Sequence, residues 1–162
     1  MNELLEKISS YNLFNYLFPG VLFAVVADAV TGTQLIQNDI VIGVFTYYFF
    51  GAVVSRIGSV VIEPILRRLE FIRFAPYGDF VRASKSDPKL EILSETNNMY
   101  RTLCALFLLI GALTAYDKLA TTLPWLKTAA PSISIFGLFI LFLISYRKQT
   151  NYISQRIEAQ LR

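Results

Sequence analysis

The sequence predicts an all-α integral membrane protein with four transmembrane helices, and three observations support this fold class. Hydrophobic residues make up 54% of the 162 residues and charged residues only 17%, against about 25% charged in an ordinary soluble protein. Four apolar runs approach or reach the length of about 20 residues that a transmembrane helix needs. Twelve of the fifteen Lys and Arg residues lie in the terminal segments and in the long segment between the second and third runs.

Residues 1–18 are predicted to form an amphipathic helix that lies in the membrane interface. Apolar residues recur there at spacings of three or four, from Leu4 to Phe18, and this spacing places them on one face of a helix. Pro19-Gly20 is expected to break the helix and turn the chain into the bilayer.

Residues 19–62 are predicted to contain the first two transmembrane helices, and residues 102–146 the third and fourth. A polar turn at 37–39 separates the first pair, and a loop over 120–131 that includes Pro124 and Pro131 separates the second pair. In chain order, the expected spans are 19–36, 40–62, 102–119 and 132–146.

The segment 63–101 is predicted to be a helical loop outside the membrane, because it is long, basic and only partly apolar. Pro64 to Ala75 is expected to prolong the second span, and the stretch Ala75 to Asp79 to form a turn. Asp87-Pro88 is typical of a helix start, so a helix is expected to run from about Pro88 into the third span. The tail, 147–162, is polar and helical in composition.

The distribution of positive charge predicts which side of the membrane each segment faces. Lys and Arg are concentrated in both terminal segments and in 63–101, whereas the two opposite loops carry only Lys118 and Lys127. Because loops rich in Lys and Arg stay in the cytoplasm, both termini and the middle loop are expected to be cytoplasmic.

The composition argues against an enzyme, a metal site or a bound cofactor. The chain has no histidine and a single cysteine, Cys104, and it contains none of the phosphate-binding, zinc-protease or serine-hydrolase motifs. Membrane topology already accounts for the basic middle loop, so nucleic-acid binding is not indicated.

Arg56 and Asp28 are the candidate intramembrane polar pair. Counting 1.5 Å per residue from the expected ends of the spans, Arg56 lies about 10 Å and Asp28 about 13 Å from the cytoplasmic surface. A charge at the bilayer centre costs about 3 kcal/mol or more, which an ion pair would partly offset. The alternative is that Arg56 extends its side chain to the surface and needs no partner.

Gly51, Ser55 and Ser59 recur every four residues and form a candidate helix-packing seam. Small residues on one face let another helix approach closely. The approaching helix can belong to the same chain or to a second copy, and the spacing does not distinguish these alternatives.

The middle loop also provides the candidate surface for a soluble cytoplasmic partner. Two asparagines near the start of the third span indicate hydrogen bonding at a helix end, and a solvated helix end is the alternative. The residues of this candidate surface are Arg67, Arg68, Arg73, Glu95, Asn97 and Asn98.

The four-span plan resembles the small membrane proteins of bacterial phage-defence gene clusters, such as the membrane subunit of Kiwa systems. The stretch SYNLFNYLFPG, residues 10–20, is similar to the first segments of small bacterial inner-membrane proteins. The resemblance implies a multi-pass inner-membrane protein that forms a homo-oligomer among membrane lipids and acts as an anchor or sensor for a soluble partner. A pore or membrane-perturbing effector, or a small transporter, built around Asp28 and Arg56, is the alternative.

Overall fold

A computed structural model describes residues 12–161, and every regular element in this range is helical. Four of the helical runs are long and apolar enough to cross a membrane. The elements, in chain order, are η1 (Leu13–Leu17), α2 (Phe18–Thr31), α3 (Ile40–Ile57), η2 (Gly58–Ile62), α4 (Glu63–Arg68), α5 (Tyr77–Ser86), α6 (Lys89–Thr122) and α7 (Trp125–Leu161).

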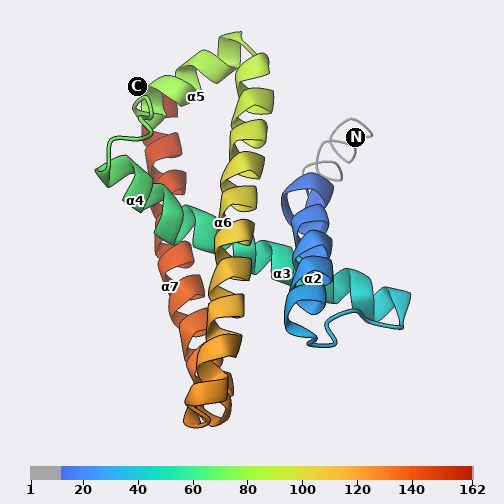
Figure 1. The fold of residues 1–162 in the computed structure, drawn as a ribbon. Coiled ribbons are helices and arrows are strands. Elements are labelled where there is room, and N and C mark those ends of the chain that lie inside the picture. The colour runs from blue at the N-terminus through green and yellow to red at the C-terminus, as the bar shows by residue number, and fades with distance from the viewer. Residues whose placement is uncertain (1–11, 162) are drawn as a thin grey trace.

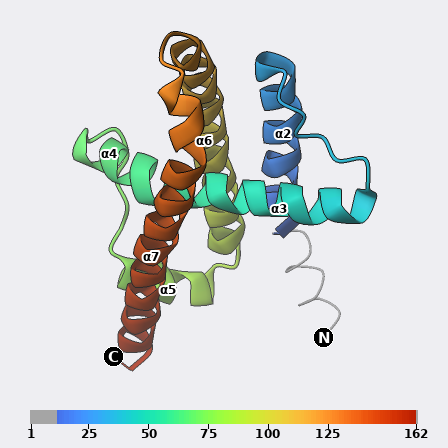
Figure 2. The same cartoon turned by 90° about the horizontal axis from the view of Figure 1, so that it is seen from below.

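One long helix lies across the other three. The elements α3, η2 and α4 form a continuous helix from Ile40 to Arg68, called the crossing helix below. It runs across α2, α6 and α7, which lie roughly along one common direction (Figures 1 and 2). The sequence had predicted four upright spans. Because one helix lies across the other three, the four apolar helices cannot all stand upright in one membrane.

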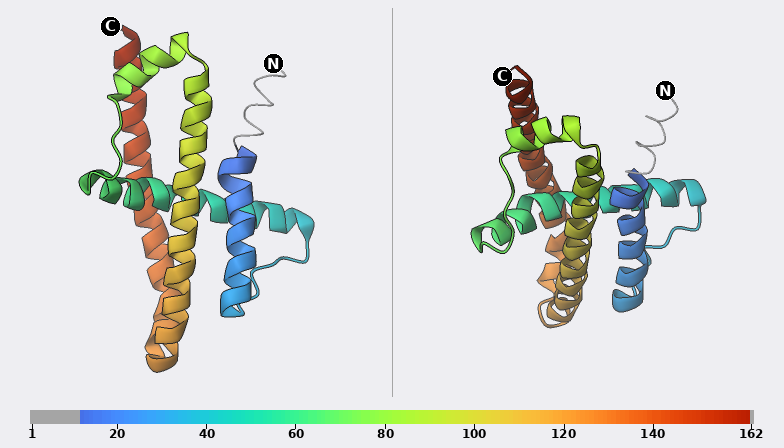
Figure 3. Two further views of the ribbon diagram at one scale, coloured as in Figure 1. Left: turned by 45° about the horizontal axis from the view of Figure 1, so that its top comes forward. Right: turned by 90° about the horizontal axis from the view of Figure 1, so that it is seen from above.

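The start of α2, the helix α5 and the end of α7 lie on the same side of the molecule, and the turn between α6 and α7 lies on the opposite side (Figure 3). This arrangement agrees with the expectation that the tail and the middle loop share one side. The interfacial helix expected over 1–18 lies mostly outside the described residues.

Pro19-Gly20 does not break the first helix, contrary to the prediction. The helix continues from Leu13 to Thr31, and η1 immediately before the proline has the wider π geometry, with the Phe18 N–H donated to the Leu13 carbonyl. A proline within a regular helix clashes with the preceding turn and removes a donor. The π-turn accommodates the proline, so the helix continues through it.

A second π-turn precedes Pro64 in the crossing helix. The π-turn η2 ends with the Glu63 N–H donated to the Gly58 carbonyl. In the π register the Ser59 carbonyl would pair with the nitrogen of Pro64, which carries no hydrogen. The chain therefore needs another donor for Ser59.

The middle segment differs from its prediction in two places. The crossing helix ends at Arg68 rather than near Ala75, because Glu70 adopts a left-handed conformation (φ 55°). The Phe71 N–H then binds the Leu66 carbonyl at 3.0 Å and caps the helix end. The expected turn at Ala75–Asp79 is largely the first turn of α5, which begins at Tyr77.

The helices α6 and α7 are longer than the predicted third and fourth spans. Asp87 accepts the Lys89 N–H at 3.0 Å and caps α6, as its position before Pro88 had indicated. The expected loop over 120–131 is reduced to Leu123 and Pro124, because α7 begins at Trp125 and includes Pro131. Six helical residues precede Pro131, so the proline falls early in a helix long enough to tolerate one missing hydrogen bond.

Candidate functional site

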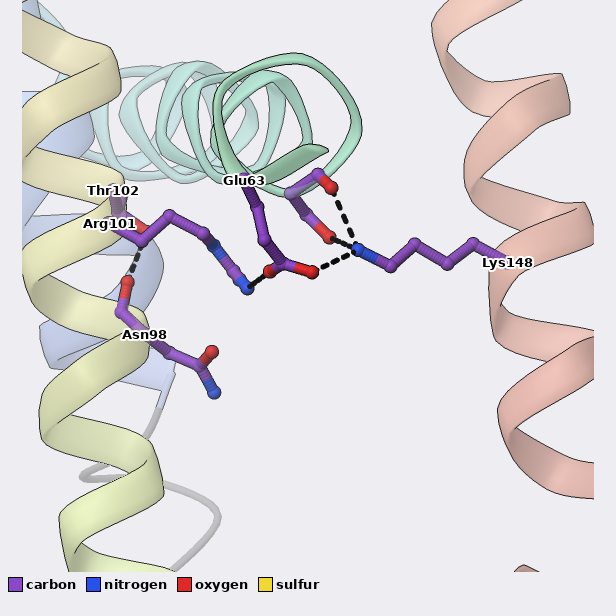
Figure 4. Close-up of polar contacts among 6 residues, drawn as sticks. Glu63, Asn98, Arg101, Thr102 and Lys148 are labelled. Carbon is purple, nitrogen blue, oxygen red and sulfur yellow. Dashed lines mark hydrogen bonds and ion pairs between the residues drawn. The ribbon is translucent and has the colours of Figure 1, made fainter. Parts of the chain in front are cut away.

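Three charged residues that flank the predicted spans meet at one point. Glu63 follows the second predicted span, Arg101 precedes the third and Lys148 lies just beyond the fourth. Figure 4 shows the Arg101 and Lys148 side chains reaching Glu63 from opposite sides, one from α6 and the other from α7. We call Glu63, Arg101, Lys148 and Ser59 the charge cluster.

Glu63 is the centre of the charge cluster. Its carboxylate accepts hydrogen bonds from Arg101 Nη1 at 2.6 Å and from Lys148 Nζ at 2.9 Å. The Glu63 side chain is 6% exposed, whereas those of Arg101 and Lys148 are 20% and 25% exposed. A buried carboxylate is stable only when it is paired and hydrogen-bonded, and both carboxylate oxygens meet that requirement here.

Lys148 also completes the hydrogen bonding of the π-turn. Its ammonium donates to the Ser59 carbonyl at 2.7 Å and to the Ser59 hydroxyl at 2.9 Å. The carbonyl that loses its helical partner to Pro64 is thus paired by a side chain from α7. The charge cluster therefore ties α7 to the crossing helix.

Small residues allow the helices to come close enough for these contacts. A Cβ atom added to Gly58 would lie 3.2 Å from the Arg101 carbonyl and 3.4 Å from the Ala105 Cβ. Next to this approach lies a buried apolar core, formed by Val54, Ile62, Ala105 and Leu106. The position of Arg101 beside Glu63 follows from this packing.

The two residues of the predicted intramembrane pair have different partners. Asp28 accepts the backbone N–H of Leu35 at 2.9 Å, and Arg56 donates to the Tyr16 hydroxyl at 3.1 Å. Among the described residues the structure contains no ion pair between Asp28 and Arg56. The prediction that the two form a pair is therefore corrected.

Asp28 has a local role in the segment that returns from α2 to the crossing helix. The backbone of 32–37 is not helical, and such a segment leaves N–H groups without partners. Asp28 binds the N–H of Leu35, and the Tyr47 hydroxyl accepts the N–H of Gln37 at 2.9 Å. Side chains of the two flanking helices thus replace the missing backbone partners. The pore and transporter alternatives required a site shared by Asp28 and Arg56, and the two residues do not form one.

The predicted seam is packed within the chain. Gly51, Ser55 and Ser59 are all buried. A Cβ atom on Gly51 would lie 1.7 Å from the Tyr16 carbonyl oxygen, so η1 and the crossing helix meet backbone to backbone. Ser59 faces α7 instead and belongs to the charge cluster.

The six residues of the predicted partner surface lie on different elements and make different contacts. Arg67 places its guanidinium 5.6 Å from the centre of the Phe74 ring, Arg73 pairs with Glu70 at 3.0 Å, and Arg68 is exposed near the end of α4. Glu95, Asn97 and Asn98 lie on α6, where only Asn97 is exposed. The Asn98 carbonyl accepts the hydroxyl of the fully buried Thr102.

Glu63, Arg101 and Lys148 were missed as site residues by the reasoning from sequence. A detectable signal was that Glu63 is the only acid between Asp39 and Glu70 and directly precedes a proline. An isolated acid at the end of an apolar run calls for a cation on a neighbouring helix.

Among residues 12–161, no three His, Cys, Asp or Glu side chains are grouped so that they could hold a metal ion. Comparison of the chain with protein-family models, with curated proteins and with solved structures finds no match. The inference of function therefore depends on the geometry.

Proposed function

We propose that this protein is a non-enzymatic, oligomeric subunit of a bacterial inner membrane that holds a soluble protein partner on its cytoplasmic side. The apolar parts of the four long helices make it a membrane protein. The proposal for the cytoplasmic side is supported by a polar helical layer made of α5 and the adjoining ends of α6 and α7 (Figure 3).

This layer is held together by contacts of its own. Val81 of α5 is buried, and the Tyr77 ring lies 5.2 Å from the ring of Tyr152 on α7. Gly78 lies next to Ala159, whose Cβ would be 3.7 Å from a Cβ added to the glycine. The end of α7 is therefore a positioned element rather than a free tail.

The observation that supports partner binding most strongly is an apolar stripe on the far face of that element. Ile153, Ile157 and Leu161 follow at intervals of four and are 52%, 54% and 82% exposed. At 3.6 residues per turn they lie opposite Tyr152 and Ala159, which contact α5. Because this part of α7 lies beyond the apolar span, lipid does not cover the stripe. We infer that it receives an amphipathic helix of a soluble partner.

On α6, Leu93, Asn97 and Tyr100 follow at intervals of four and three, and all three are exposed. This second strip contains one residue of the predicted partner surface, Asn97. We include it in the proposed docking region.

The experiment compares Ile157→Arg with Asn151→Arg, which adds the same charge to an exposed position on another face of α7. We expect a soluble protein to co-purify in stoichiometric amount with the parent and with Asn151→Arg, and to be lost from Ile157→Arg while the oligomer mass stays the same. Retention by Ile157→Arg, or a loss of oligomer mass in that variant, would contradict the proposal.

From the resemblance to phage-defence membrane subunits, we further propose that this partner belongs to an antiviral complex. In that setting, Ile157→Arg is expected to abolish protection of the host cells against phage, and Asn151→Arg to preserve it. Equal protection by the two variants would argue against the antiviral setting but would leave partner binding to the purification experiment.

A further inference from the structure

An apolar groove runs between the crossing helix and α7. Its volume is about 580 Å³, within the range of about 300–1,000 Å³ that is typical of ligand pockets. Phe49, Val53 and Ile57 of the crossing helix line one wall, and Leu138 and Leu141 of α7 line the other. The groove has the chemistry of a site for a hydrocarbon chain.

A second hollow, next to the groove, borders the charge cluster. Val60 and Ile144 line both spaces, so the two lie side by side. The hollow has a volume of about 360 Å³, and its polar lining includes Glu63, Arg67 and Lys148. Glu63 pairs with Arg101 and Lys148, and Arg67 adds a third cation at this end. This end of the groove is therefore positively charged.

We propose that the groove and the hollow together bind one anionic phospholipid. The phosphate would accept hydrogen bonds from Arg67, next to the ion pair of Lys148 and Glu63, and an acyl chain would occupy the apolar groove. Positive charge and apolar surface follow one another here in the same order as the headgroup and the chain of a lipid. Basic pockets at the cytoplasmic ends of transmembrane helices select anionic headgroups in this way.

The position of the hollow agrees with this occupant. On α6 and α7, which the crossing helix runs across, Arg101 and Lys148 each lie within two residues of a predicted span. The hollow is thus at the depth where apolar sequence gives way to polar sequence, which is where a headgroup meets its acyl chains. A soluble anion would fill the hollow but leave the groove open, and a second copy of the chain would have no evident use for the positive end.

The first test fills the groove in the full-length protein. In Gly137→Leu the new side chain enters the groove, and Gly111→Leu is the matched control on α6; a Cβ atom at either glycine meets nothing within 4 Å. We expect Gly137→Leu to retain less than half as much phospholipid per chain as the parent after detergent exchange, and Gly111→Leu to retain the parental amount. Equal retention by the two variants would overturn the proposal. A lower oligomer mass in Gly137→Leu with unchanged phospholipid would also overturn it, because the groove would then hold a second copy.

The second test asks whether the bound lipid must be anionic. We expect phosphatidylglycerol in mixed micelles to raise the unfolding midpoint of the parent more than phosphatidylcholine does. Arg67→Gln should remove most of this difference, whereas Arg82→Gln, which changes an arginine that is ion-paired on the surface of α5, should keep it. The same response to both lipids in the parent, or an equal loss in the two variants, would overturn the proposed selectivity for an anionic headgroup.

Discussion

The crossing helix makes two contacts of opposite character. Near its middle, Gly51 and Gly20 bring it against η1 and α2 with backbone next to backbone, and a Cβ atom on either glycine would lie 1.7 Å from a carbonyl oxygen of the other helix. Near its end, Glu63 reaches α6 and α7 through long charged side chains. The first contact depends on the absence of side-chain atoms at Gly20 and Gly51, and the second on the cationic side chains of Arg101 and Lys148.

This difference predicts how each contact responds to change. Backbone atoms cannot move aside without shifting a whole helix, so the glycine contact tolerates no added atom. Arg101 and Lys148 are flexible and partly exposed, so water can compensate for some of the loss at the charge cluster. We therefore expect the first half of the molecule to be the more sensitive to substitution.

The largest effect is expected for Gly51→Ala, because the added methyl would overlap the Tyr16 carbonyl. We expect a loss of about 3 kcal/mol in the free energy of unfolding, measured by thermal or denaturant unfolding in detergent. Gly111→Ala is the control, since its methyl meets nothing within 4 Å and should stabilise the helix by up to about 1 kcal/mol. If Gly51→Ala and Gly111→Ala are equally stable, the two helices do not meet as closely as described.

A smaller loss is expected for Glu63→Gln, which leaves Arg101 and Lys148 without their anion. Breaking a buried ion pair costs about 3–5 kcal/mol, and partial exposure of both cations reduces our expectation to about 2–3 kcal/mol. Glu95→Gln, a half-buried acid on α6, is the control and should change the stability by less than about 0.5 kcal/mol. Similar stability of these two variants would show that the charge cluster contributes little to the tie between α7 and the crossing helix.

The smallest effect is expected for Tyr16→Phe, which removes the hydroxyl that accepts from Arg56. The Tyr16 ring keeps its edge-on contact with Tyr48 at 5.4 Å, so we expect to lose only the hydrogen bond, about 1 kcal/mol. A double-mutant cycle with Arg56→Leu measures the coupling. A coupling as large as the effect of Glu63→Gln would mean that charge, and not close packing, dominates the glycine contact as well.

The sequence allowed the helical class and the starts of α3 and α6 to be predicted, because these depend on local patterns. Asp39 and Asp87 cap α3 and α6 through their carboxylates, at 2.9 and 3.0 Å, and both positions could be recognised from neighbouring residues. The continuous first helix could not, because a proline normally signals a break and the π-turn that accommodates Pro19 has no simple sequence pattern. For the same reason Pro131 concealed the first turns of α7.

The candidate site was predicted only in part, because it depends on how the helices rotate and cross. The sequence predicts similar membrane depths for Arg56 and Asp28. Arg56 nevertheless binds a tyrosine hydroxyl and Asp28 a backbone N–H, and depth alone does not predict either partner. Glu63, Arg101 and Lys148 are separated by up to 85 residues, and they meet only because the crossing helix passes between α6 and α7. Depth along a helix can be counted from a sequence, whereas the direction of a side chain around the helix axis requires the packed structure.

The two-residue connection between α6 and α7 has a consequence for how the chain enters the membrane during synthesis. Leu123 and Pro124 alone separate helices of 34 and 37 residues, so very little polar backbone has to be carried across the bilayer. Two long helices with so short a turn can be inserted together as one hairpin. Lys118 and Lys127, on either side of the turn, are the only cations among residues 102–146, so this hairpin carries little positive charge. The second half of the protein can therefore reach its transmembrane position before the charge cluster joins it to the first half.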